Sequence, residues 1–204
     1  MEDLKCSYKY TVAMPPQLSS ISEFKDKLFK KHSTAIIQGK AQLLISPIYR
    51  REESIFIQPI FDFDGRRGGG ILKAYTEAKD MKQKLEKYPS YFEVTPDGLH
   101  LVLLIAIYGI DVERYREEVK RSFSYSTLDV SASCRDVPIF RLGSYKDGQT
   151  IIPVVELNTV SIQKMKNRIP SEIYAKQKWH TLWSQYLFPT NTVSGFGFLK
   201  TIQS

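Results

Sequence analysis

The stretch that most constrains this chain is Phe56-Ile57-Gln58-Pro59-Ile60-Phe61-Asp62-Phe63-Asp64-Gly65, an apolar run that ends in two carboxylates. Because successive side chains of a strand point to opposite faces, Asp62 and Asp64 share one face and Phe61 and Phe63 the other. Two acids on one face are costly unless a positive charge lies between them. Divalent Mg²⁺ or Mn²⁺ prefers such oxygen ligands. The alternative interpretation is a solvated strand end before a turn.

Length and composition indicate one folded domain with a basic surface. The chain has 204 residues, of which 42% are hydrophobic, enough for a sizeable core and too many for a disordered chain. The formal net charge is +7, which favours polyanionic partners, nucleic acid first. Cys6 and Cys134 define no disulfide framework, and no Cys/His spacing predicts zinc.

Targeting and membrane signals are missing from the sequence. No apolar run reaches the length that a membrane-spanning helix needs. The N-terminus lacks the basic start and apolar middle of a signal peptide. We therefore expect a soluble intracellular protein without a membrane partner, cytoplasmic or associated with the nucleoid.

Hydrophobic periodicity predicts alternating helices and strands. Helices are expected over 21–32, 72–87 and 112–123, with a last helix opening at Pro170 and Ser171. Strands are expected over 40–48, 54–63, 91–95, 99–108, 126–130, 138–142 and 150–157. Turns are expected at 50–53, 65–70, 96–98 and 146–148.

The order strand, helix, strand, strand, helix, strand between 54 and 157 predicts an α+β fold with helices on one face of a sheet. This order resembles the ferredoxin-like core of RNA-recognition motifs, which alone implies no function. We expect a single domain over 1–204. It would comprise an N-terminal α/β part over 1–50, the core over 54–157 and a C-terminal helical extension over 160–204.

Acidic and imidazole positions recur at the ends of successive predicted strands. Asp62 and Asp64 are followed by Gly98-Leu99-His100 and then by Asp129, within Thr127-Leu128-Asp129-Val130. Neighbouring strands could place the three carboxylates around one or two metal ions, with the imidazole nearby. The segment Arg141 to Lys146 would add cations for a triphosphate. Nucleotidyl transfer needs such a set of groups.

In these motifs the chain resembles the archaeo-eukaryotic primase superfamily, and within it the primase-polymerase domains of plasmids and viruses. The family carries an Asp-x-Asp motif after an apolar strand, a small-x-His motif, an apolar-Asp motif and an arginine-bearing strand with a Gly-Ser-x-x-Lys-like turn. The likeness covers about 54–155. The family usually has serine where this chain has Gly98, so backbone amides of 97–99 would have to replace a hydroxyl donor. Relatives often carry a zinc knuckle, for which this chain has no ligands.

The resemblance implies roles for individual residues. Two Mg²⁺ or Mn²⁺ ions, and no zinc, would be bound by Asp62, Asp64 and Asp129. The incoming nucleotide would be bound by Gly98, His100, Arg141, Ser144 and Lys146. Nucleic acid would be contacted by Arg50, Arg51, Arg66, Arg67, Lys176 and Lys178. For Lys176 and Lys178, a helix that packs its aromatic side chains on the core is an equal alternative.

The resemblance thus implies a template-dependent nucleotidyltransferase that synthesises primers in DNA replication. Its partners would be a single-stranded DNA template, ribo- or deoxynucleoside triphosphates, and a separate helicase or accessory primase subunit. One alternative is a primer-dependent gap-filling or translesion polymerase of the same superfamily. Another is a non-catalytic subunit that binds single-stranded nucleic acid.

Overall fold

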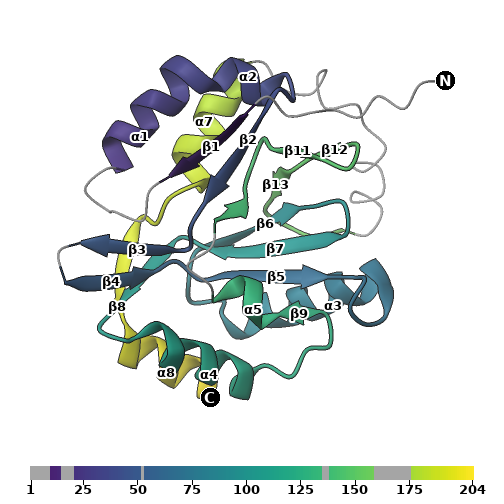
Figure 1. Ribbon diagram of the computed structural model, residues 1–204. Helices are drawn as coiled ribbons and strands as arrows, with labels where there is room; N and C mark the ends of the chain where they lie inside the picture. Colours follow the sequence, from purple (N-terminus) through teal and green to yellow (C-terminus); the bar gives the residue numbers. More distant parts are fainter. Residues whose placement is uncertain (1–9, 15–20, 52, 135–137, 159–175) are drawn as a thin grey trace.

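Figure 1 shows the computed structural model of the chain, which describes residues 10–14, 21–51, 53–134, 138–158 and 176–204. The expected α+β class is confirmed: several sheets and several helices alternate along the described chain. The largest sheet has five strands in the order β13-β6-β7-β5-β9. Its strands are β5 (Ile60–Asp64), β6 (Ser90–Val94), β7 (Gly98–Leu103), β9 (Leu128–Asp129) and β13 (Ile152–Val154).

Every pairing within this sheet is antiparallel. Helix α3 (Gly70–Lys84) covers the face into which Phe61 and Phe63 point. On that face Phe61 packs edge-on against Phe123, and Phe63 packs against Tyr125. The alternation of side chains along β5 therefore leaves its two aspartates on the opposite face, as the sequence predicts.

A second sheet has four strands in the order β14-β8-β4-β3. Its strands are β3 (Ile48–Arg51), β4 (Ser54–Ile57), β8 (Ile105–Tyr108) and β14 (Asn191–Ser194). Helices α4 (Val112–Ser122) and α8 (Gly195–Gln203) pack against each other beside this sheet (Figure 1).

A third sheet joins β1 (Tyr10–Met14) in parallel to β2 (Ala41–Ile45), and β2 to the short strand β10 (Ile139–Phe140). A helical segment formed by α1 (Ile21–Lys27), η2 (Leu28–His32) and α2 (Ser33–Ile37) precedes β2, and α2 packs against α7 (Lys176–Tyr186). A hairpin of β11 (Tyr145–Lys146) and β12 (Gln149–Thr150) follows β10. Its turn has Asp147 and Gly148 at positive φ, as the Asp-Gly pair predicts.

Several of the expected strands differ in extent from the observed ones, and two long ones are each divided. The strand expected over 54–63 is two strands, because Pro59 has no amide to donate and breaks the run between β4 and β5. The strand expected over 99–108 is divided at Leu104 between two sheets, as β7 and β8. An unbroken apolar run does not reveal which sheet each part will join.

Other boundaries also differ. Arg50 and Arg51 lie within β3 and not in a turn, and the first helical segment continues to Ile37. Residues 170–171, where the last helix was expected to open, lie outside the described residues. The sequence did not predict β14 and α8, because Asn191–Ser194 is polar and two glycines disfavour helix at the start of α8.

Gly98 permits the close approach of β7 to β5. A Cβ atom at Gly98 would lie 1.8 Å from the carbonyl oxygen of Phe63, an atom of the strand backbone that cannot move aside alone. The serine that the primase family usually has here therefore does not fit this pair of strands.

We expect the substitution Gly98→Ser to destabilise the protein by about 3 kcal/mol, the upper end of the cost of overpacking. Gly197→Ala is the matched control, because a Cβ atom at Gly197 meets nothing within 4 Å. Replacement of a glycine in a helix by alanine stabilises a protein by up to about 1 kcal/mol. Urea denaturation measures both. Equal midpoints for wild type and Gly98→Ser would contradict the close approach.

Candidate functional site

Four titratable side chains form one row across the five-stranded sheet. On β5, Asp62 pairs with His100 of β7 on one side and with Asp129 of β9 on the other. His100 in turn pairs with Glu93 of β6. Side chains directly opposite each other on adjacent strands have Cβ atoms about 5 Å apart. The structure therefore brings together Asp62, His100 and Asp129, as the sequence predicts, and adds Glu93.

Asp64 lies beside this row, opposite Gly98. A pocket of about 160 Å³ opens between the sheet and the segment 138–151. Its lining consists of Asp62, Asp64, Arg66, Thr95, Asp97, Gly98, His100, Pro138, Ile139, Phe140, Lys146 and Ile151. The pocket is thus acidic on the sheet side, with apolar side chains and Lys146 on the other. It is smaller than the roughly 300–1,000 Å³ of most small-molecule sites.

The aspartates of β5 lie in different electrostatic environments. Burial, together with the negative charges of Asp129 and Asp64, raises the pKa of Asp62, although His100 partly offsets this. In contrast, hydrogen bonds from Arg66 lower the pKa of Asp64. Asp62 is therefore the carboxylate whose charge the protein itself compensates least.

Two arginines of the glycine-rich loop after β5 are paired with the acids. Arg66 Nη2 lies 2.9 Å from Oδ2 of Asp64, and Arg66 Nη1 lies 3.3 Å from Oδ2 of Asp97. Arg67 Nη2 lies 2.5 Å from Oδ2 of Asp129. Both arginines were predicted to contact nucleic acid. In this structure they neutralise the candidate ligands instead.

Asp129 has a further structural role. Its Oδ1 accepts a hydrogen bond of 3.1 Å from the amide of Ala132 and so caps the short helix α5 (Val130–Ser133). The same turn ties β9 to β5, because the Asp62 amide donates to Ser133 Oγ, which donates to the Asp129 carbonyl oxygen. The position of Asp129 beside Asp62 is thus fixed by hydrogen bonds as well as by strand pairing.

Within the described part of the chain, no three His, Cys, Asp or Glu side chains are arranged to hold a metal ion. In this structure Arg66 is paired with Asp64, and Asp129 is paired with Arg67 and caps α5. The donors still suit a hard divalent cation, because three carboxylates lie on adjoining positions of two strands. Burial is the main cause of the raised pKa of Asp62, and the neighbouring carboxylates Asp129 and Asp64 add to it.

Arg141 is fully buried and does not line the pocket. Its Nε donates to Oε1 of Glu93 over 2.8 Å, and its Nη2 donates to the hydroxyl of Tyr91 over 3.0 Å. The predicted contact of Arg141 with a triphosphate is therefore wrong for this structure. The guanidinium is paired with the buried carboxylate of Glu93, and a sequence motif does not reveal such a pairing.

Ser144 is also fully buried, away from the pocket lining. Its Oγ donates to the carbonyl oxygen of Leu43 over 2.9 Å and accepts from the Leu43 amide over 2.8 Å. Its predicted contact with the nucleotide is therefore corrected: it fastens the segment after β10 to β2. Lys146 does line the pocket, and its charge acts on Asp62.

Gly98 lines the pocket as expected, but its amide donates to Thr95 Oγ1 over 3.1 Å. This amide is thus already engaged, and Thr95 brings a hydroxyl to the pocket that the prediction did not include. Asp97, from the same turn, also lines the pocket and pairs with Arg66.

The remaining basic candidates do not line the pocket. Arg50 is exposed on β3, and the side chain of Arg51 is outside the described part. Lys176 and Lys178 are exposed at the start of α7, whose Trp179 and Trp183 are buried. The alternative of a helix that packs its aromatic residues on the core is therefore confirmed for these two tryptophans, which are not available to stack on bases.

Glu93 is the main residue that the sequence prediction missed. A carboxylate within Tyr91-Phe92-Glu93-Val94 is unusual in a buried strand. In the structure Glu93 and His100 are equidistant from a turn centred at 96–97 and so pair across the hairpin, whereas the expected turn at 96–98 implies a register shifted by one residue. The carboxylate inside this otherwise apolar strand was the signal in the sequence that could have identified Glu93.

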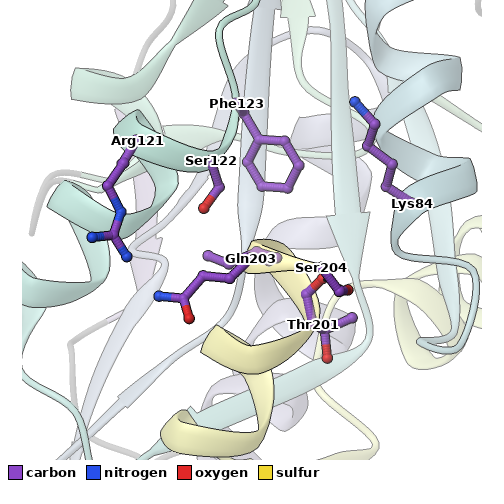
Figure 2. A pocket seen from close by; sticks show the side chains of 8 residues that line it. Lys84, Arg121, Ser122, Phe123, Thr201, Gln203 and Ser204 are labelled. Carbon is purple, nitrogen blue, oxygen red and sulfur yellow. The ribbon is translucent and has the colours of Figure 1, made fainter.

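A larger hollow of about 740 Å³ shares no lining residue with the acidic pocket (Figure 2). It lies where α3, α4 and α8 end, and Lys84, Arg121 and Gln203 line it. Lys84 is paired with Asp80 and Arg121 with Glu118. Both of these cations are therefore already compensated, whereas the acidic pocket gathers titratable side chains from two adjacent strands. The acidic pocket is therefore the candidate site.

A scan against protein-family models found no match, and searches of curated proteins and of solved structures found none either. Among the described helices, none has both the length and the apolar character that crossing a membrane requires. Function must therefore be inferred from the site itself.

Glu77 of α3 holds the segment that leads into β9. Its carboxylate accepts from the amides of Ser126 and Thr127 over 3.2 and 2.9 Å, and from both hydroxyls. Burial opposes ionisation, but these hydrogen bonds outweigh it and lower the pKa of Glu77. Because Asp129 follows two residues later, Glu77 helps to place it.

We expect Glu77→Gln to cost about 1–2 kcal/mol near neutral pH, since charged hydrogen bonds are lost. A lowered pKa means that the carboxylate stabilises the fold above its unfolded value of about 4.3 and loses this effect as pH falls further. The difference between wild type and variant should therefore shrink below about pH 4 in urea denaturation. The control Glu113→Gln, on an exposed helix face, should stay within about 0.5 kcal/mol. A pH-independent difference at Glu77 would contradict this assignment.

Proposed function

We propose that this chain is the catalytic domain of a DNA-templated nucleotidyltransferase, a primase or primase-polymerase. The observation that carries the proposal is the row of Asp62, His100 and Asp129 across three adjacent strands, with Asp64 beside it. Both aspartates of the Asp-x-Asp motif, the histidine of the small-x-His motif and Lys146 line one pocket. These groups suit a substrate with a triphosphate and divalent cations.

The strand order also supports the proposal. Within the larger sheet, β6-β7-β5-β9 places β7 between β5 and β6, which are joined through α3. This split β-α-β arrangement is that of the ferredoxin-like modules that the sequence resembles. The net charge of +7 suits a nucleic-acid template.

In this proposal Asp62, Asp64 and Asp129 hold two Mg²⁺ or Mn²⁺ ions. Bound there, the ions supply the positive charge that activates a 3′-hydroxyl and neutralises the departing pyrophosphate. His100 and Lys146 bind phosphate oxygens, and Phe140 and Ile139 bound the pocket on the side away from the sheet. Because the pocket is small and Arg66 lines it, a nucleotide enters once Arg66 leaves Asp64.

The double variant Asp62→Ala, Asp64→Ala should lose nucleotide incorporation by at least about 10³-fold, in line with losses from removing transition-state electrostatics. The assay uses an unprimed single-stranded DNA template, Mg²⁺ or Mn²⁺, and labelled ribo- and deoxynucleoside triphosphates. Asp26→Ala is the control, since Asp26 is exposed on α1 and paired only with Lys30 among the contacts described. Retained synthesis in the double variant would refute the assignment.

The same assay separates the alternatives. Extension of an added primer without synthesis on bare template would indicate a primer-dependent polymerase. Binding of single-stranded DNA without any incorporation would indicate a non-catalytic subunit, which the pairing of Arg66 and Arg67 with two of the acids specifically favours.

The arginine pairs predict an effect on metal affinity. Arg66 and Arg67 lie where a cation would approach, so the double variant Arg66→Gln, Arg67→Gln should bind Mn²⁺ about tenfold more tightly, as for the loss of two competing pairs of about 0.7 kcal/mol each. Calorimetry or electron paramagnetic resonance measures this. Arg121→Gln, which breaks an exposed arginine pair elsewhere, should leave Mn²⁺ affinity unchanged. Weaker binding by the double variant would show that the arginines do not compete with the metal.

A further inference from the structure

Glu93 is the centre of a buried hydrogen-bond network behind the acidic pocket. Its side chain is fully buried. Oε1 lies 2.8 Å from Arg141 Nε and 2.7 Å from the hydroxyl of Tyr91, and Oε2 lies 3.0 Å from Nδ1 of His100. Burial opposes the charge of Glu93, but Arg141 and the hydrogen bonds from His100 and Tyr91 outweigh it, so the pKa of Glu93 is lowered.

An ionised carboxylate can only accept hydrogen bonds. The bond between Glu93 and His100 therefore requires a proton on Nδ1. The other ring nitrogen, Nε2, is then directed toward the pocket, where it lies 3.9 Å from Oδ1 of Asp62. Since His100 is nearly buried and lies between Glu93 and Asp62 in the row, the ring has a defined inner and outer nitrogen.

Arg141 is itself anchored from outside the sheet. Its amide donates to the carbonyl oxygen of Leu43 on β2 over 2.9 Å. The next residue, Leu142, accepts a hydrogen bond from the indole of Trp183 on α7 over 2.9 Å. The backbone that carries the guanidinium is thus anchored by two elements that do not line the pocket. Burial acts to lower the pKa of Arg141 as well, but the negative charge of Glu93 outweighs this effect, so the pKa of Arg141 is raised.

We propose that Glu93 is a positioning residue: it fixes the Nδ1 proton and the orientation of His100, and Arg141 holds Glu93 in place for this purpose. The consequence for the reaction rests on the proposed function. When both ring nitrogens carry protons, Nδ1 donates to Glu93 and Nε2 donates into the pocket, which is the arrangement that a phosphate oxygen needs.

The competing explanation is a buried ion pair that only joins β6 to the segment after β10. Such pairs are often replaceable by apolar residues without loss of stability, whereas removal of one partner leaves a buried charge and destabilises strongly. A purely structural pair would affect stability and leave the protonated nitrogen of His100 unchanged. The two explanations therefore make different predictions for the proton on Nδ1 of His100.

Two double variants separate them without leaving a buried charge. Glu93→Gln with Arg141→Met keeps an amide oxygen that can accept from Nδ1 of His100. Glu93→Leu with Arg141→Met removes that acceptor. Because both double variants lack Arg141, they differ only in the side chain at position 93. Thermal unfolding first compares both with wild type.

The first readout is the ¹⁵N spectrum of the His100 ring, assigned by comparison with His100→Gln. We expect the neutral ring to carry its proton on Nδ1 in wild type and in the Glu93→Gln double variant, and to lose this preference in the Glu93→Leu double variant. A wild-type ring protonated on Nε2 would overturn the proposal without any variant. An unchanged ring spectrum in the Glu93→Leu double variant would do the same.

The second readout is the affinity for a nucleoside triphosphate in the presence of Ca²⁺. The Glu93→Leu double variant should bind about tenfold more weakly, and the Glu93→Gln double variant within about threefold of wild type. Equal losses in both would overturn the proposal, since the acceptor at position 93 would then not matter. Because the ring spectrum is recorded without nucleotide, it decides the role of Glu93 even if the incorporation assay refutes the proposed function.

Discussion

The register of β5 between β7 and β9 is the constraint on which the site depends. A shift of one residue would turn Asp62 and Asp64 into the core and bring Phe61 and Phe63 to the pocket. The register is maintained on one side by the tight contact of Gly98 with the Phe63 carbonyl. On the other side, Ser133 links Asp62 to Asp129. Because Phe61 and Phe63 are buried under α3, Asp62 and Asp64 lie on the opposite face of the sheet.

Charge compensation is the second organising feature. The site concentrates carboxylates on a sheet face, and the described structure neutralises them in two ways. Glu93 is compensated by a fully buried arginine, which makes its environment independent of solvent ions. Asp64 and Asp129 are compensated by arginines that are half or more exposed, so these pairs are weak and exchangeable. Asp62, which lies between Asp129 and His100 in the row, pairs with no arginine among the ion pairs of the described residues, and burial raises its pKa.

The sequence predicted the site's acids better than its cations. The two-residue period of β5 is a local feature, and it was enough to place Asp62 and Asp64 on one face, while the order of motifs in the resembled family suggested that His100 lies near them. Arg141 and Ser144 were misassigned because their partners, Glu93 and Leu43, lie 48 and 101 residues away. No local pattern reports such pairings.

The fold shows the same division. The fold class and the positions of α3 and α4 followed from periodicity, whereas the break of one apolar run into β7 and β8 depends on which sheet receives each half. Helix α8 was missed because burial of Phe198 and Ile202 overrides its two glycines.

The shortness of β9 has a consequence for motion in the site. This strand has two residues, and its attachment relies on Glu77 and on the α5 turn more than on a long ladder. Regions with few backbone pairings open at lower free energy than the rest of a domain. Asp129 can therefore leave the row by a local opening while Asp62 and Asp64 stay on β5. Any ligand that binds all three carboxylates would close this opening by mass action, so occupancy of the site and order of β9 would rise together.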